Sequence, residues 1–159
     1  QLIESGVHLT VFNEYLLPKK KKLGLKSHRN MDDNVAILKI FPGINKNVID
    51  AMLGTKNLKA LVLETYGSGN APMEEWFLDR LNKAIKKGIH IINVTQCSGG
   101  AVMMGHYETS SRLKKMQVIN GKDITTEAAI TKAMYLLGCG VSQDLFKTVF
   151  ETSLRGEML

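Results

Sequence analysis

Three short apolar runs, each followed by a loop and a helical pattern, constrain the fold of this chain most. They are VAILKIF (35–41), KALVLET (59–65) and IHIINVT (89–95). A strand that is apolar on both faces is typical of a parallel sheet between two layers of helices. Because strand–helix–strand connections are right-handed, the pattern predicts an α/β fold, a three-layer sandwich with a small parallel sheet flanked by helices.

Helical spacing of apolar residues predicts the covering layers. Two helices are expected between the runs, over 45–53 and 73–88, and glycines at 54 and 88 end both patterns. After the third run we expect a short helix near 112–116, a longer one that begins at Thr125 or Thr126, and a last one over 142–154.

The first 33 residues follow a different pattern. Residues 2–6 (LIESG) resemble the end of a helix stopped by glycine, and residues 7–13 alternate like a strand. Residues 14–33 are polar, charged and aperiodic, which predicts a linker or a long excursion. Since the first residue is Gln1, we expect the chain to begin inside a longer sequence.

Composition argues against several classes of protein. The formal net charge is +6, but the lysine block 19–22 has no interleaved aromatic residues, which favours a solvated linker over a nucleic-acid site. No apolar run approaches the roughly 20 residues that span a bilayer. The two cysteines lack metal or disulfide spacing and the four histidines are scattered, so we expect reduced thiols, no metal and no cofactor.

Candidate site residues follow the predicted strands, because ligands bind beyond the carboxyl ends of parallel strands. In the YGSGNAP loop (66–72), Asn70 could cap the next helix or bind a ligand, and local reasoning favours the cap. Cys97 could be a nucleophile if His106 activated it, but a structural thiol is favoured. Glu64 ends an apolar strand and points either to solvent or to a ligand. These residues alone predict a ligand-binding or interface domain without complete catalytic machinery.

Several segments together resemble a known family. They are MDDNVAILKIFPGI (31–44), ALVLETYGSGNAP (60–72), IINVTQCSGGAVMMGHY (91–107), DITTEAAITKAMYLLG (123–138) and LRGEM (154–158). As a set they resemble the C-terminal domain of type I (cytoplasmic) bacterial L-asparaginases, which hydrolyse L-asparagine to aspartate and ammonia. The resemblance implies that 1–33 form the end of an N-terminal domain and a linker, and that 34–159 form the C-terminal domain. The family's nucleophilic threonine lies in a TGGT-type motif of the N-terminal domain, helped by a Thr-Asp pair and a lysine further along. This sequence lacks these motifs, so no catalytic residue is expected here and the chain alone should be inactive.

The resemblance also implies roles for particular residues. Asn70, with Tyr66, would reach the substrate of a neighbouring subunit, and Glu64, Thr65, Asn70 and Cys97 would line an effector site. Allosteric members carry arginine where this chain has Glu64, so we expect weak effector binding. The implied partners are L-asparagine, the chain's own N-terminal domain and further copies in a cytoplasmic homo-oligomer, a dimer of dimers, with no nucleic acid or membrane. Two alternatives stay open: the asparaginase-like subunit of a tRNA-dependent amidotransferase, and a non-catalytic amino-acid-binding or oligomerisation module.

Overall fold

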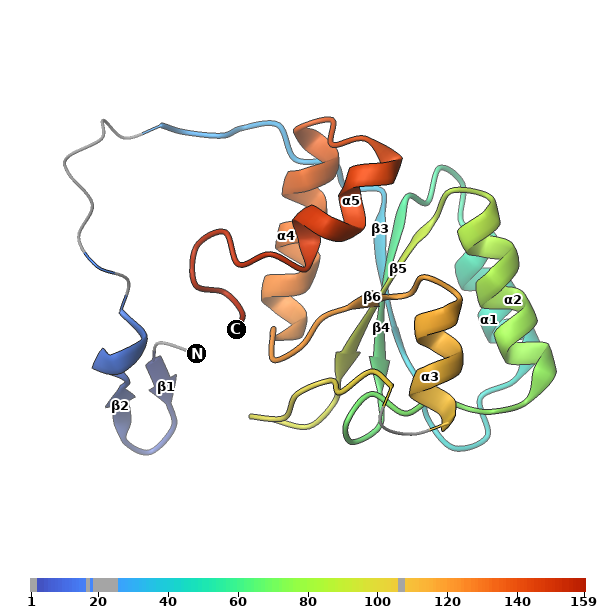
Figure 1. Cartoon of the computed structure of the whole chain (residues 1–159), viewed down its shortest axis with the longest axis horizontal. Coiled ribbons are helices and arrows are strands. Elements are labelled where there is room, and N and C mark those ends of the chain that lie inside the picture. Colours follow the sequence, from blue (N-terminus) through green and yellow to red (C-terminus); the bar gives the residue numbers. More distant parts are fainter. Residues whose placement is uncertain (1–2, 17, 19–25, 106–107) are drawn as a thin grey trace.

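A four-stranded parallel sheet lies at the centre of the molecule. The computed structural model describes residues 3–16, 18, 26–105 and 108–159. The strands are adjacent in chain order, β3-β4-β5-β6, and every neighbouring pair is parallel. Their bounds are β3 (Val35–Lys39), β4 (Ala60–Thr65), β5 (His90–Thr95) and β6 (Ile119–Asn120). Figure 1 shows this sheet between two groups of helices, which confirms the predicted α/β three-layer architecture.

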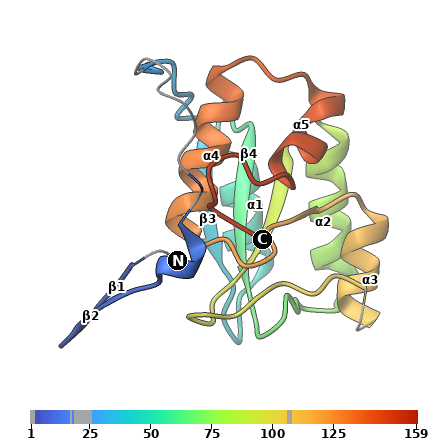
Figure 2. The same ribbon diagram turned by 60° about the vertical axis from the view of Figure 1, so that its left-hand side comes forward.

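Helices cover both faces of the sheet. On one face pack α1 (Lys46–Leu53), α2 (Glu75–Lys86) and α3 (Glu108–Lys115), and on the other α4 (Thr126–Gly138) and α5 (Gln143–Phe150). The turned view in Figure 2 separates the same two layers. Asn45 caps α1 and Thr125 caps α4 through their side-chain oxygens. In the part of the chain that the structure describes, no helix is long and apolar enough to cross a membrane.

The core explains why the predicted strands are apolar on both faces. In β4, Leu61 and Leu63 pack with the layer of α1 and α2, whereas Val62 packs with α4 and α5. Each of these side chains is fully buried. The prediction holds less well for β3, where Ile37 and Lys39 are exposed, because β3 lies at the edge of the sheet. The two central strands are thus buried on both faces except at Glu64 and Thr95, which are partly exposed.

Other differences concern short elements. The prediction of a helix end over 2–6 is wrong: β1 (Ile3–Ser5) pairs antiparallel with β2 (Leu9–Val11), and the single turn η1 (Asn13–Tyr15) follows. The strand predicted over 7–13 is shorter than expected. Strand β6 was not predicted, because two residues are too few to show a period. The lysine block 19–22 lies outside the described residues.

The segment before β3 is joined closely to α4. The Asp32 N–H donates to the Met134 carbonyl at 3.0 Å, and the Lys59 ammonium lies 2.6 Å from the Asp32 carboxylate. The hydrogen bonds from Lys59 and Asn34 lower the pKa of Asp32 to about 2. A Cβ at position 138 would lie 2.2 Å from the Asn30 carbonyl oxygen, so glycine is required there. These contacts hold residues 30–34 against α4 and the beginning of β4.

We expect His90 to make the domain sensitive to mild acid. Its ring stacks on Phe146 with centroids 3.8 Å apart and is 9% exposed, and burial lowers its pKa to about 4. In the unfolded chain His90 binds a proton near pH 6.5, whereas in the folded chain it does so only near pH 4. The contribution of His90 to the free energy of unfolding is therefore fully present above about pH 6.5. It is lost as the pH falls toward 4, by up to about 3 kcal/mol. Urea denaturation of wild type and His90→Leu at pH 4.5 to 7.5 measures this. An equal slope in both proteins would contradict it.

Candidate functional site

A tight turn follows β4 at the carboxyl edge of the sheet. The Tyr66 N–H donates to the Asn70 carbonyl and the Asn70 N–H donates to the Tyr66 carbonyl, both at 2.8 Å. Within it Gly67 and Gly69 have φ angles of +50° and +101°, which glycine adopts without strain. A Cβ on Gly69 would also lie 2.7 Å from Val102 Cγ1. The sequence GSGN thus builds a closed loop that presents Tyr66 and Asn70 at the end of the strand.

Buried side chains of β4 and β5 hold this turn in place. The Thr65 hydroxyl donates to Asn93 Oδ1 at 2.6 Å, and Asn93 Nδ2 donates to the Gly69 carbonyl at 3.1 Å. Neither Thr65 nor Asn93 is exposed to solvent. At the rim, the Thr95 hydroxyl donates to the Gly67 carbonyl. Because these bonds run from the strand ends to the backbone of the turn, the position of the turn is fixed by the sheet.

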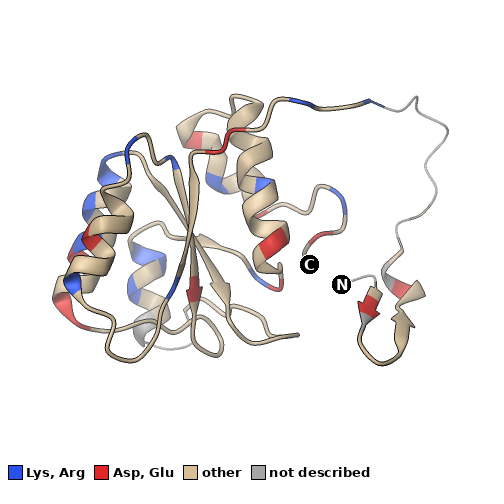
Figure 3. Ribbon diagram, turned by 180° about the vertical axis from the view of Figure 1, so that it is seen from behind, with Lys and Arg blue, Asp and Glu red and all other residues tan. Residues whose placement is uncertain are grey.

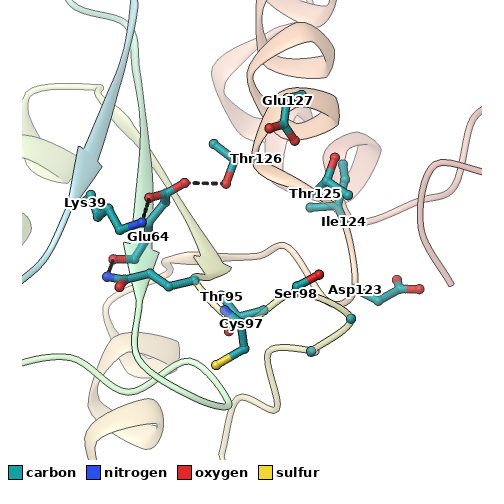
Figure 4. A pocket seen from close by; sticks show the side chains of 13 residues that line it. Lys39, Glu64, Thr95, Cys97, Ser98, Asp123, Ile124, Thr125, Thr126 and Glu127 are labelled. Carbon is teal, nitrogen blue, oxygen red and sulfur yellow. Dashed lines mark hydrogen bonds and ion pairs between the residues drawn. The ribbon is translucent and has the colours of Figure 1, made fainter. Parts of the chain in front are cut away.

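A cavity of about 270 Å³ opens beside the turn, at the ends of β3, β4 and β5. Figure 4 shows Glu64 extending into it toward the beginning of α4. Thr126 Oγ1 donates to Glu64 Oε1 at 2.6 Å, and Lys39 Nζ lies 3.7 Å from Glu64 Oε2. The opposite wall is the loop after β5, which contributes Cys97. The cavity is polar, and the Glu64 carboxylate is more enclosed than the neighbouring ammonium, since the Glu64 side chain is 15% exposed against 66% for Lys39.

Gln96 joins the carboxyl ends of three strands beneath the cavity. Its side-chain Nε2 donates to the Ile40 carbonyl at 2.7 Å and to the Glu64 carbonyl at 2.9 Å, while its backbone N–H donates to the Thr65 carbonyl at 2.9 Å. One side chain from the end of β5 thus joins the ends of β3 and β4. Gln96 bonds only to the backbone of Glu64, whose side chain extends into the cavity toward Thr126.

The sequence-predicted site residues fall into two neighbouring groups. Glu64 and Cys97 line the cavity, whereas Tyr66 and Asn70 lie on the turn and are not among the described residues that line it. Thr65 is buried beneath both, with its hydroxyl bonded to Asn93 and to the Val94 carbonyl. The structure therefore places Glu64 and Cys97 along the same cavity, whereas Tyr66 and Asn70 lie outside its lining.

The structure bears on the local interpretations of Asn70 and Cys97. Asn70 is not a helix cap, because α2 begins at Glu75 with Glu74 as its N-cap, four residues further along. The favoured interpretation of Asn70 as a cap was therefore wrong. Cys97 is exposed and its N–H donates to Thr95 Oγ1 at 3.0 Å. His106, the base considered for it, lies outside the described residues.

Sequence reasoning missed Thr126, Asn93 and Asp123 as parts of this region. The sequence around Thr126 indicates only the beginning of a helix. Asn93 is a polar residue inside an apolar strand, and this pattern was the one signal in the sequence for a buried polar contact. Asp123 lines the cavity from the loop before α4. No group of three or more potential metal-ligating side chains occurs among the residues that the structure describes.

The fold is a parallel α/β sandwich with its candidate site at the carboxyl edge of the sheet. Residues 34–150 match the family described as Glutaminase/Asparaginase C-terminal domain. Because this match covers most of the chain, the chain belongs to that family.

Relatives with known names agree with this assignment. L-asparaginase 1 of Escherichia coli K12 is 36% identical over 157 residues, which cover 99% of this chain and 46% of that protein. The human 60 kDa lysophospholipase is 38% identical over 154 residues, covering 96% of this chain and 26% of that protein. A crystal structure of L-asparaginase I from Vibrio cholerae shares 34% identity with a TM-score of 0.84, over 99% of this chain and 47% of that chain.

A relative that is named as an amidotransferase subunit is less similar. It belongs to the glutamyl-tRNA(Gln) amidotransferase of Pyrococcus abyssi and is 29% identical over 128 residues, which cover 80% of this chain and 28% of that protein. The chain spans about half the length of the bacterial L-asparaginases that it matches.

Proposed function

We propose that this chain takes part in the hydrolysis of L-asparagine to aspartate and ammonia as the C-terminal domain of an L-asparaginase. The proposal rests on the family match over residues 34–150 and on the Tyr66–Asn70 turn, which Asn93 holds at the carboxyl edge of the sheet. In this proposal residues 1–33 form the end of an N-terminal domain and the linker, and 34–159 form the C-terminal domain. The nucleophile and its base come from the N-terminal domain, because no TGGT-type motif occurs in these 159 residues.

The proposed contribution to the substrate site is the turn. Asn70, supported by Tyr66, would reach the substrate of a neighbouring subunit in a homo-oligomer, a dimer of dimers. An amide side chain offers both a donor and an acceptor, which suits the amino and carboxylate groups of an amino acid. The turn is already fixed through Asn93 and Thr95, so little ordering would be needed on binding. We place this enzyme in the cytoplasm, as in the type I bacterial asparaginases that the sequence resembles.

A chimera tests the proposed activity. The N-terminal half of Escherichia coli L-asparaginase 1 is joined to this chain, and ammonia release from L-asparagine is measured. We expect activity in the chimera and none in the chain alone. Asn70→Ala should lower kcat/KM by about 100-fold, since a polar contact to a charged group is worth roughly 1.5–3 kcal/mol.

Ser68→Ala on the same turn is the matched control. It should change kcat/KM less than about threefold, because the bonds that hold the turn come from Asn93 and Thr95. A folded chimera that releases no ammonia would count against the proposal. So would equal activity of the Asn70→Ala and Ser68→Ala chimeras.

Effector binding at the cavity is proposed to be weak. The proposed effector set consists of Glu64, Thr65, Asn70 and Cys97. The resemblance implies that the effector's carboxylate binds next to position 64, and here the Glu64 carboxylate extends into the cavity. Like charges at short range disfavour binding. We expect isothermal calorimetry with L-asparagine or L-aspartate to show no binding at micromolar concentrations.

Glu64→Arg should bind either amino acid at least about tenfold more tightly, because it replaces repulsion with an ion pair. Glu127→Arg at the rim of the same cavity controls for net charge. Micromolar binding by wild type, or equal gains in both variants, would contradict a specific role for Glu64.

The amidotransferase alternative has weaker support, because the relatives of that name are less similar than the L-asparaginases. The same chimera separates the two, since an amidotransferase component would depend on a tRNA-binding partner. A non-catalytic amino-acid-binding module would instead bind asparagine tightly in calorimetry without restoring ammonia release.

A further inference from the structure

A second cavity lies at the amino edge of the sheet, at the opposite end of the strands from the candidate site. Its volume is about 280 Å³, and its lining shares no described residue with the cavity beside Glu64. The beginnings of β5 and β6 form its base, and the first turn of α5 forms part of its rim. In Figure 1, α5 lies beside the amino end of β5. This cavity is therefore separate from the region assigned to asparagine.

The base of the cavity contains a buried imidazole ring. His90 is 9% exposed, and its ring stacks on Phe146 at an interplanar angle of 12°. No described residue forms a hydrogen bond with either ring nitrogen. Over the same part of the chain, every fully enclosed side-chain nitrogen or oxygen atom has a hydrogen-bond partner. The ring nitrogens of His90 therefore reach open space, and the cavity is the open space that this ring lines.

The His90 ring is prepared to bond to a neutral group. Burial lowers the pKa of His90 to about 4, so at neutral pH the ring is uncharged and offers one N–H donor and one nitrogen acceptor. Because the stack on Phe146 fixes the plane of the ring, binding requires little further ordering. A buried polar group without a partner costs free energy, which a ligand that bonds to it recovers.

Two glutamine amides lie at the rim of the cavity. Gln143 Nε2 donates to the Gly88 carbonyl at 3.2 Å, which leaves Gln143 Oε1 as an acceptor. Gln117 has a φ angle of +65°, and no described residue bonds to its side-chain amide. An amide carries a donor and an acceptor side by side, and it pairs with a second edge of the same kind, as glutamine does with adenine. The rim thus repeats the donor and acceptor character of His90.

The charges around the cavity disfavour a charged ligand. The Lys147 ammonium donates to the Val118 carbonyl at 2.8 Å and lies 3.4 Å from the Glu151 carboxylate, so it is already engaged. Asp144, in the first turn of α5, adds a carboxylate to the rim. Figure 3 shows charged residues mainly on the helices and loops, with few on the strands that form the base. An anion would be repelled by Asp144 and a cation by Lys147.

We propose that this cavity binds a small neutral molecule with an amide-type edge, in which a hydrogen-bond donor and an acceptor lie side by side. Carboxamides and nucleobases share this chemistry. His90 and Gln117 bond to the edge of the ligand, and four isoleucines of the lining cover its apolar body. The volume lies just below the range of about 300–1,000 Å³ that is typical of pockets for drug-sized ligands, which suits a molecule of one or two rings.

Isothermal calorimetry of the whole 159-residue chain at pH 7 tests the proposal with three probes. Nicotinamide represents a carboxamide, adenine represents a nucleobase, and nicotinate is the anionic counterpart of nicotinamide. We expect at least one neutral probe to bind with a dissociation constant below about 1 mM, and nicotinate to bind at least about tenfold more weakly than that probe. Binding of adenine alone identifies a nucleobase as the ligand, and binding of nicotinamide alone identifies a carboxamide.

Two variants test the residues that bond to the ligand. His90→Phe keeps the stack on Phe146 but removes both ring nitrogens, and it should weaken binding at least about tenfold. Gln117→Gly removes the amide at a φ angle that glycine adopts without strain, so the variant should fold, and binding should weaken at least about fivefold. Asn57→Gly is the matched control, because Asn57 has a φ angle of +61°, is exposed and does not line the cavity. It should change the dissociation constant less than about twofold.

Nuclear magnetic resonance locates the bound probe. The Cε1–H signal of His90 should shift during the titration, whereas that of the exposed His8 should not. A shift at His8 but not at His90 would overturn the proposal. So would the absence of binding by both neutral probes at roughly 5 mM, well above the expected dissociation constant. Equal binding of nicotinate, or wild-type binding by both His90→Phe and Gln117→Gly, would contradict it as well.

The inference goes beyond the proposed function and does not depend on it. Binding is measured on the chain alone and without L-asparagine, so its failure leaves the asparaginase proposal untouched. A chimera that releases no ammonia would likewise leave the proposed ligand of this cavity unaffected.

Discussion

Asn93→Leu is expected to lower the free energy of unfolding by about 2 kcal/mol. Asn93 is fully buried, accepts from the Thr65 hydroxyl and donates to the Gly69 carbonyl. A leucine of similar size keeps the volume but leaves the Gly69 carbonyl without this donor, whereas the Thr65 hydroxyl keeps the Val94 carbonyl as its acceptor. Each buried polar group left unpaired costs about 1–3 kcal/mol. Urea denaturation at pH 7 measures the change.

The exposed Asn47 on α1 provides the matched control, and Asn47→Leu should change stability by less than about 0.5 kcal/mol. In the chimera, Asn93→Leu should also raise the KM for L-asparagine, because the turn that carries Asn70 loses its support. A loss of stability below about 1 kcal/mol, the lower end of the cost of an unpaired buried group, would show that the network does not hold the turn.

Glu157→Ala is expected to destabilise the domain by about 3–4 kcal/mol. The Lys132 ammonium bonds to the Glu157 carboxylate and to the Thr152 carbonyl, and the Lys132 side chain is only 4% exposed. Removing one partner of a buried ion pair leaves an uncompensated charge, which typically costs about 3–5 kcal/mol. Glu157 also accepts the N–H groups of Leu154 and Arg155, so its loss opens the C-terminal turn. Thermal and urea unfolding measure the effect.

Asp79→Ala, which breaks the exposed pair with Lys83, is the control and should cost less than about 0.5 kcal/mol.

The buried pair also predicts that the stability of the domain falls at low pH. Burial alone would raise the pKa of Glu157, but the Leu154 N–H and the Lys132 ammonium lower it to about 2. Stability from this group is therefore present above about pH 4.5 and is lost as the pH falls toward 2. A Glu157→Ala protein as stable as wild type at pH 7 would contradict the argument.

The layers of the fold could be predicted because their signals are periodic. Runs such as 59–65 are apolar over most of their length, and only burial on both faces stabilises such a strand. The sequence of β6 carries no such signal. Residues 2–6 gave the wrong element, because three residues of strand followed by glycine look the same as a helix end.

The candidate site was predicted in its parts but not in its arrangement. Glycines at 67 and 69 indicated a tight turn, and φ angles of +50° and +101° explain them. The contacts of Glu64 with Lys39 and Thr126 join residues up to 62 positions apart, and no local pattern contains them. Long-range hydrogen bonds of this kind depend on the register of the sheet, which periodicity does not specify.

The sequential order of the strands has a consequence for how the chain folds. Because β3, β4, β5 and β6 are neighbours in the same order as they are synthesised, each new strand pairs with one completed shortly before. Contacts that are close in sequence reduce the entropy lost on loop closure and speed folding. The unit can therefore assemble progressively from its N-terminal side during translation, one crossover at a time, and α4 and α5 close the second layer last.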